Sequence, residues 1–131
     1  MIENLKSKFY TKLVDKGYHI SDRPNFEEKY PWLILRLSNL TKMKFLKVRY
    51  TVADIKIDVF STYSGEKEIL SIEDEATTIA EEIAAEVPEI MGVALKSCRI
   101  IDDKEKGPVM KHGILVYQFV LTTEEDANED E

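Results

Sequence analysis

The chain has 131 residues and a formal net charge of −7, with 33% of its residues charged and 44% hydrophobic. A chain of this length fits one domain that buries roughly two-thirds of its unfolded surface, so its core needs neither a disulfide nor a metal. The single cysteine, Cys98, excludes an internal disulfide. The acidic balance argues against specific nucleic-acid binding, because a polyanion is held mainly by lysine and arginine.

The ends of the chain give no targeting or membrane signal. The start, Met1–Lys6, is charged and periodic, so we expect no secretion signal. The uncharged stretch 113–123 is far shorter than the about 20 apolar residues that a membrane helix needs. We therefore expect no membrane partner.

The two halves of the chain carry opposite charge. Residues 1–63 hold 12 Lys and Arg against 7 Asp and Glu, whereas residues 64–131 hold 6 against 18. Opposite charges on two faces of a subunit would favour a contact between different faces of neighbouring subunits. Alternatively, folding interleaves the two halves and averages the charge.

In the first half, apolar spacings of three and four residues predict a helix over 2–15, which Gly17 ends. Residues 18–29 have no period and are expected to form an irregular connection. The proline at 31 then favours an extended backbone, and the apolar run Trp32–Leu37 predicts a central strand closed by a turn at Ser38-Asn39.

Residues 44–62 alternate between apolar and polar side chains, which predicts a long strand interrupted near its start by a hairpin or a bulge. Its predicted dry face consists of Ala53, Ile55, Ile57 and Val59. The opposite face, with Asp54, Lys56 and Asp58, is expected to be solvated, since the two carboxylates are separated by about 13 Å and by a lysine.

In the second half, Ser71 and Asp74 have the spacing of a capping box and predict a helix start. Pro88 is expected to end this helix. The predicted buried stripe is Ile72, Ala76, Ile79, Ile83 and Val87, with Glu81, Glu82 and Glu86 turned away from it. After a turn at Met91-Gly92, strands over 93–101 and 113–122 are expected to form a hairpin across the charged loop 102–107.

These elements predict an α+β fold with a mixed, mainly antiparallel sheet of four to five strands flanked by two helices. Residues 1–123 would form a single domain. The tail, 124–131, has six acidic residues in eight and is expected to be disordered.

We find no catalytic, cofactor or metal motif. The five glycines do not fall into a dinucleotide-binding or phosphate-binding spacing, and His19, His112 and Cys98 stand alone. The sequence therefore predicts no cofactor, no metal and no enzyme activity. His112 is expected to be a surface or strand-end residue, with a pH-sensitive contact as the alternative. Cys98 is expected to be buried and inert.

Two charged sets are the candidate contacts with another subunit or a partner protein. The basic set lies near Phe45 and Tyr50 and consists of Lys42, Lys44, Lys47 and Arg49. The acidic set lies in the 102–107 loop and consists of Asp102, Asp103 and Glu105. A calcium site in this loop is excluded, because lysines occupy positions where liganding oxygens should come. The simpler interpretation of the basic set is a solvated hairpin. The functional alternatives are a contact with nucleic acid or with an acidic protein surface, of which the charge asymmetry of the chain favours the protein surface.

Three segments together carry a family resemblance: Tyr30–Leu37, then Ala53–Ser61 leading to the apolar stripe at 76, 79, 80 and 83, and finally His112–Phe119. This pattern resembles the tail terminator, or tail completion, proteins of long-tailed bacteriophages. The resemblance implies a sheet flanked by helices, no catalysis, and a ring, usually of six subunits, that contacts the tail-tube protein and the head-tail connector protein. It also implies a location in the virion tail, and in the host cytoplasm during assembly. The acidic tail is not expected of that family.

Two other functions remain open from the sequence. One is a neighbouring neck or head-closure protein. The other is a monomeric acidic module, of the inhibitor or immunity type, that binds a basic partner protein.

Overall fold

The structure, a computed structural model, describes residues 2–21, 31–62, 65–102 and 110–123. Within these ranges it contains two helices and one five-stranded sheet. The elements are α1 (Ile2–Asp15), β1 (His19–Ile20), β2 (Trp32–Phe45), β3 (Val48–Ser61), α2 (Lys67–Glu86), β4 (Ile90–Asp102) and β5 (Lys111–Thr123). The predicted α+β fold is confirmed.

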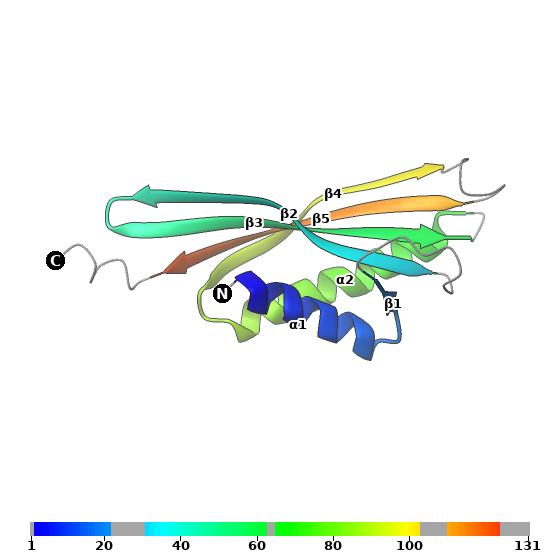
Figure 1. The fold of residues 1–131 in the computed structure, drawn as a ribbon, viewed down its shortest axis with the longest axis horizontal. Coiled ribbons are helices and arrows are strands. Elements are labelled where there is room, and N and C mark those ends of the chain that lie inside the picture. The colour runs from blue at the N-terminus through cyan, green and yellow to red at the C-terminus, as the bar shows by residue number, and fades with distance from the viewer. Residues whose placement is uncertain (1, 22–30, 63–64, 103–109, 124–131) are drawn as a thin grey trace.

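The strand order in the sheet is β1-β2-β3-β5-β4. The β1–β2 pair is parallel and the other three pairs are antiparallel, so the sheet is mixed and mainly antiparallel as predicted. Both helices lie on one face of the sheet (Figure 1). The long β2–β3 hairpin extends beyond the helices at one end of the molecule (Figure 1).

Helix α1 has the bounds that the sequence predicts. Its buried residues Leu5, Phe9 and Leu13 share one face, and Gly17 follows at φ +96°, a conformation that glycine adopts without strain. The segment after it is less irregular than expected, because its residues 19–20 pair with the start of β2 as a short parallel strand. Residues 22–30 lie outside the described part of the chain.

The predicted turn at Ser38-Asn39 is wrong. Strand β2 continues to Phe45, and the ladder with β3 only shifts register between Leu37 and Asn39. The side chain of Ser38 donates a hydrogen bond to the carbonyl oxygen of Asp54 at 3.3 Å, so the extra residue forms a bulge rather than a chain reversal. The reversal comes later, at residues 46–47, which confirms the predicted interruption of the 44–62 segment.

Helix α2 begins at Lys67, one turn before the predicted capping box, so Ser71 lies inside the helix. Ile69, which is fully buried, extends the apolar stripe toward the N-terminus and explains the earlier start. The end is as predicted: Val87 has an extended backbone before Pro88. The predicted stripe at 72, 76, 79 and 83 is buried, while residue 87 is partly buried.

Strands β4 and β5 form the predicted antiparallel hairpin, but β4 begins at Ile90 instead of 93 and includes the expected turn Met91-Gly92 as part of a bulge. Helix α2 approaches β5 closely at Gly113, where a Cβ atom would lie 2.6 Å from Cγ2 of Ile69. Glycine is therefore the residue that allows this helix to pack on the sheet.

The main core fills the space between the helices and the sheet. Phe9 of α1 packs against two aromatic rings of β5, with ring centroids 5.7 Å from Tyr117 and 6.2 Å from Phe119. The Tyr117 hydroxyl donates to the carbonyl oxygen of Glu73 at 3.2 Å. A smaller cluster lies on the opposite face of the sheet and consists of Trp32, Ile34, Phe60 and Met110.

Candidate protein-interaction site

The four predicted basic residues meet on the exposed end of the β2–β3 hairpin. All residues from 36 to 49 are exposed. The ladder pairs Lys44 with Arg49 and Lys42 with Thr51, and directly paired residues of antiparallel strands share a face. Alternate residues of a strand share a face, and Thr51 lies on the same face as the buried residues Ala53 and Ile55. The basic face of the hairpin is therefore continuous with the face of the sheet that packs on the helices.

The other face of the hairpin is apolar. Here Met43 pairs with Tyr50, and Phe45 pairs with Val48. Phe45 is 66% exposed, and Met43 and Val48 are exposed as well. On this hairpin only the basic residues were predicted as contacts, although the alternation of lysine with apolar residues over 42–45 already indicated a two-faced strand.

The turn of this hairpin carries a large apolar residue in an unfavourable backbone conformation. Leu46 has φ +59° and is 81% exposed. Two-residue hairpin loops that need a positive φ favour glycine, asparagine or aspartate there, since a Cβ atom is strained in this region. Leu46 therefore projects from the apex, with Lys47 beside it.

The predicted acidic set is at the other end of the molecule. Asp102 ends β4 and pairs with Lys111, which in turn pairs with Ser61 at the end of β3 that is remote from the hairpin turn. Over the 14 residues of β3, this separation corresponds to about 40 Å. Asp102 accepts a hydrogen bond from Lys111 Nζ at 2.5 Å, and this bond raises the pKa of Lys111. Asp103 and Glu105 lie outside the described residues.

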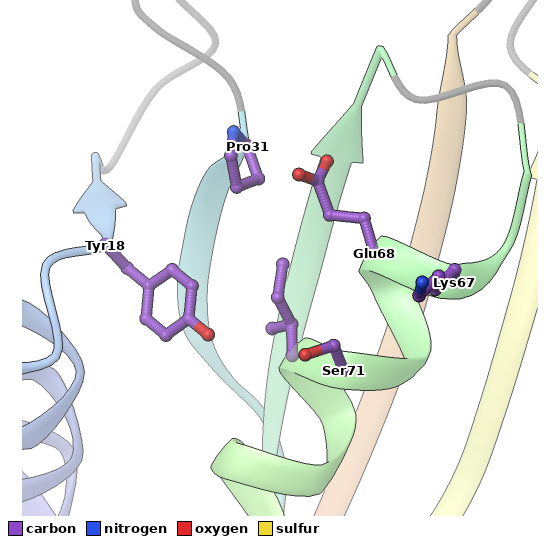
Figure 2. Close-up of a pocket in the computed structure, with 6 residues that line it drawn as sticks. Tyr18, Pro31, Lys67, Glu68 and Ser71 are labelled. Carbon is purple, nitrogen blue, oxygen red and sulfur yellow. The ribbon is translucent and has the colours of Figure 1, made fainter.

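A pocket of about 360 Å³ opens at this same end, between β1 and the first turns of α2. Figure 2 shows the Tyr18 ring on one side, Pro31 above and the α2 side chains on the other side. The residues that line it are Tyr18, Pro31, Lys67, Glu68, Ser71 and Ile72. The pocket thus combines apolar walls with a charged rim.

The carboxylates near the pocket accept hydrogen bonds from hydroxyl groups. Ser61 Oγ donates to Glu68 Oε1 at 2.5 Å, and the Tyr18 hydroxyl donates to Glu75 Oε1. Burial, the hydrogen bond to Glu75 and the charges of Glu75 and Glu68 together raise the pKa of the Tyr18 phenol well above its usual range. Two carboxylates of α2 therefore lie near the pocket, with Lys67 at its rim.

The prediction that Asp54 and Asp58 face solvent is wrong. Their residues are only 3% and 5% exposed, although no described helix covers this face of the sheet. Asp54 Oδ2 lies 3.0 Å from Lys96 Nζ, and its Oδ1 accepts a hydrogen bond from Gln118 Nε2 at 3.2 Å. Long side chains from β4 and β5 therefore cover and compensate the buried carboxylate.

Asp58 has a histidine partner. His112 lies at the start of β5 as expected, but it is partly buried, and its Nε2 is 2.8 Å from Asp58 Oδ1. The His112 ring also stacks on Phe60 with centroids 4.4 Å apart. Lys56 Nζ lies 3.7 Å from the other carboxylate oxygen. The contact between Asp58 and His112 joins the neighbouring strands β3 and β5, which gives the pair a structural role.

The described residues offer little to metal or thiolate chemistry. No group of three or more His, Cys, Asp or Glu among them could hold a metal ion. Burial, with a smaller effect from the charge of Glu73, raises the pKa of the half-buried Cys98 thiol and so disfavours its reactive thiolate form. Among the described residues, neither helix is sufficiently long and apolar to cross a membrane.

Comparison with known proteins assigns no family. Neither the models of known protein families nor the curated proteins give a match to this chain.

Proposed function

We propose that this protein is a non-catalytic structural protein of a bacteriophage tail. It assembles as a ring, of about six subunits in the family it resembles, at the head-proximal end of the tail tube. There it ends tube growth and joins the tail to the head connector protein. Its partners are further copies of itself, the tail-tube protein and the connector, and its location is the virion.

The observation that carries this proposal is the two-faced β2–β3 hairpin, which extends beyond the helices (Figure 1). Phe45 and Leu46 are 66% and 81% exposed, and Met43 and Val48 lie beside them. Full burial of one such side chain contributes about 1.5–3 kcal/mol, so a partner that covers the hairpin gains several-fold this amount before association costs. A contiguous apolar patch of this kind marks a protein contact.

The positions of the charges support a ring. A ring needs a contact between two different surfaces of each subunit, whereas a two-fold dimer needs one self-complementary surface. The basic hairpin lies at one end of β3, and Asp102, Glu68 and Glu75 lie toward the other end. Among the described residues, the two candidate charged sets are therefore separated along the length of β3.

The monomeric acidic module has less support. It would need the carboxylates of α2 for a basic partner, but α1 already engages part of that surface. Lys12 Nζ lies 2.9 Å from Glu86 and 3.8 Å from Glu82, and Lys8 lies 3.8 Å from Glu86. A neck or head-closure protein would also bind its partners through the hairpin and the acidic end. Its binding partner would distinguish it from a tail terminator.

The test is binding of the purified protein to isolated tail tubes assembled from the tube protein of the same viral genome. We expect electron microscopy to show a ring at one end of each tube and light scattering to show that capped tubes no longer elongate. Binding to connectors but not to tubes would favour the head-closure alternative. A protein that binds neither and stays monomeric would contradict the proposal.

A further inference from the structure

We propose, on the basis of the function above, that the apex of the β2–β3 hairpin inserts into the pocket between β1 and α2 of a second copy of this chain. The contact is head-to-tail: Leu46 and Phe45 enter the pocket, while Lys44 and Lys47 face the carboxylates around it. Four observations support this pairing of surfaces.

The first is the conformation of Leu46. Its φ of +59° is one that glycine or asparagine would adopt at lower cost, and its side chain is 81% exposed. An isolated subunit would gain nothing from a large apolar side chain held in this way. Backbone strain retained at an exposed position indicates a role outside the fold of the subunit, and a binding contact supplies one.

The second is the size and lining of the pocket. Its volume of about 360 Å³ lies at the lower end of the roughly 300–1,000 Å³ of binding pockets. Pro31, Ile72 and the Tyr18 ring provide apolar surface for a leucine or phenylalanine side chain (Figure 2). A cavity of this size suits side chains at an apex rather than a longer chain segment.

The third is charge. Glu68 lines the pocket and Glu75 lies near it, and both carboxylates accept hydrogen bonds from hydroxyl groups; Lys67 also lies at the rim. The hairpin brings the opposite sign on Lys44 and Lys47, the residues next to its apolar apex. Such complementarity fixes the orientation of a contact more than its strength.

The fourth is position. The apex and the pocket lie toward opposite ends of β3, because α2 begins shortly after Ser61 whereas the hairpin turn precedes Val48. A subunit cannot fill its own pocket with its own apex. Direct pairing of sheet edges is the less suitable alternative, because both β2 and β4 carry bulges, which blunt edges against addition of a further strand.

Two single variants test the contact. Leu46→Asp places a charge at the apex and leaves the pocket intact, whereas Ser71→Trp fills the pocket from an exposed helix position and leaves the apex intact. We expect each variant to remain monomeric at concentrations at least tenfold above those at which the unchanged protein assembles, as measured by light scattering. Leu40→Asp, an exposed leucine on the same hairpin, is the matched control and should assemble normally.

Mixing the two variants gives the decisive result. One productive contact remains, in which the apex of the Ser71→Trp chain meets the pocket of the Leu46→Asp chain, so we expect heterodimers and nothing larger. If the mixture stays monomeric, or if each single variant assembles like the unchanged protein, the inference is wrong and the proposed function still stands. An unchanged chain that neither assembles nor binds tail tubes would refute both. Circular dichroism and thermal unfolding confirm that each variant folds.

Discussion

At the scale of single residues, the face of the sheet away from the helices depends on paired charges. Asp54 is almost fully buried and is compensated by Lys96 and Gln118, while Asp58 contacts His112. A buried carboxylate that loses its cation keeps its desolvation cost without the compensating attraction. The net contribution of these pairs to stability is therefore small, whereas the loss of one partner is strongly destabilising.

Lys96→Met tests this point. It keeps most of the aliphatic length of the side chain but leaves the Asp54 carboxylate with the Gln118 amide, so we expect the free energy of unfolding to fall by about 1–3 kcal/mol. Lys42→Met, at an exposed hairpin position, is the control and should change the free energy of unfolding by less than about 0.5 kcal/mol. Equal effects of the two variants in urea denaturation would contradict a structural role for the pair.

Leu46→Gly separates strain from binding. Glycine adopts φ +59° without a Cβ penalty of about 1–2 kcal/mol, and its entropy cost offsets about 0.5–1 kcal/mol of this gain. We expect thermal unfolding to show unchanged or slightly raised stability, while light scattering shows weaker assembly. A loss of stability would instead mean that the leucine side chain serves the fold of its own subunit.

At the scale of elements, the packing of α2 on β5 depends on Gly113. A Cβ atom there would lie 2.6 Å from Ile69 Cγ2, so Gly113→Ala forces the Ile69 side chain, the helix or the strand to shift. Overpacking of this kind costs about 1–3 kcal/mol. Gly92→Ala is the matched control on β4, where nothing lies within 4 Å of the added atom. Urea denaturation should show a clear loss for the first variant and little for the second.

The contact between α1 and α2 should depend on pH. The hydrogen bond from Lys12, together with the charges of Lys12 and Lys8, lowers the pKa of Glu86 below its ordinary 4.5. The contribution of this carboxylate is therefore present at neutral pH and is lost as the pH falls through the lowered value. Glu86→Gln should lower the melting temperature at neutral pH and have no effect in strong acid. If the two proteins still differ in melting temperature in strong acid, the stabilising role of the Glu86 carboxylate is wrong.

The sequence predicted elements well where one physical signal dominated. Helical spacing defined α1 and the buried stripe of α2, and alternation defined the dry face of β3. It failed at Ser38-Asn39, since turn-forming residues are also suited to a bulge and only the pairing with β3 decides between them. It also placed the start of α2 one turn late, because the burial of Ile69 outweighs the capping preference of Ser71.

The candidate site was only partly predictable for a similar reason. Local charge density was sufficient to find the basic residues of the hairpin, including Lys42 and Lys47. The pocket could not be predicted, because it forms between segments far apart in the sequence, Tyr18 and the start of α2. The burial of Asp54 was missed because its partner Lys96 lies on β4, beyond the neighbouring strand β5.

At the scale of the whole molecule, two electrostatic effects oppose each other during assembly. Identical subunits with a formal charge of −7 repel at long range, whereas the basic hairpin and the carboxylates near the pocket attract at short range. Salt separates these effects, since the Debye length is about 30 Å at 0.01 M, about 10 Å at 0.1 M and about 3 Å at 1 M.

We therefore expect assembly, measured by light scattering, to be strongest at intermediate ionic strength. At low salt the repulsion between whole subunits is unscreened, and at high salt the local attraction is weakened while burial of the Phe45 and Leu46 side chains persists. Replacing the six carboxylates of residues 124–131 by amides should strengthen assembly at low salt and leave the high-salt decline unchanged. Assembly that rises steadily with salt would mean that apolar burial alone drives the contact, because no loss of charge attraction would then be visible.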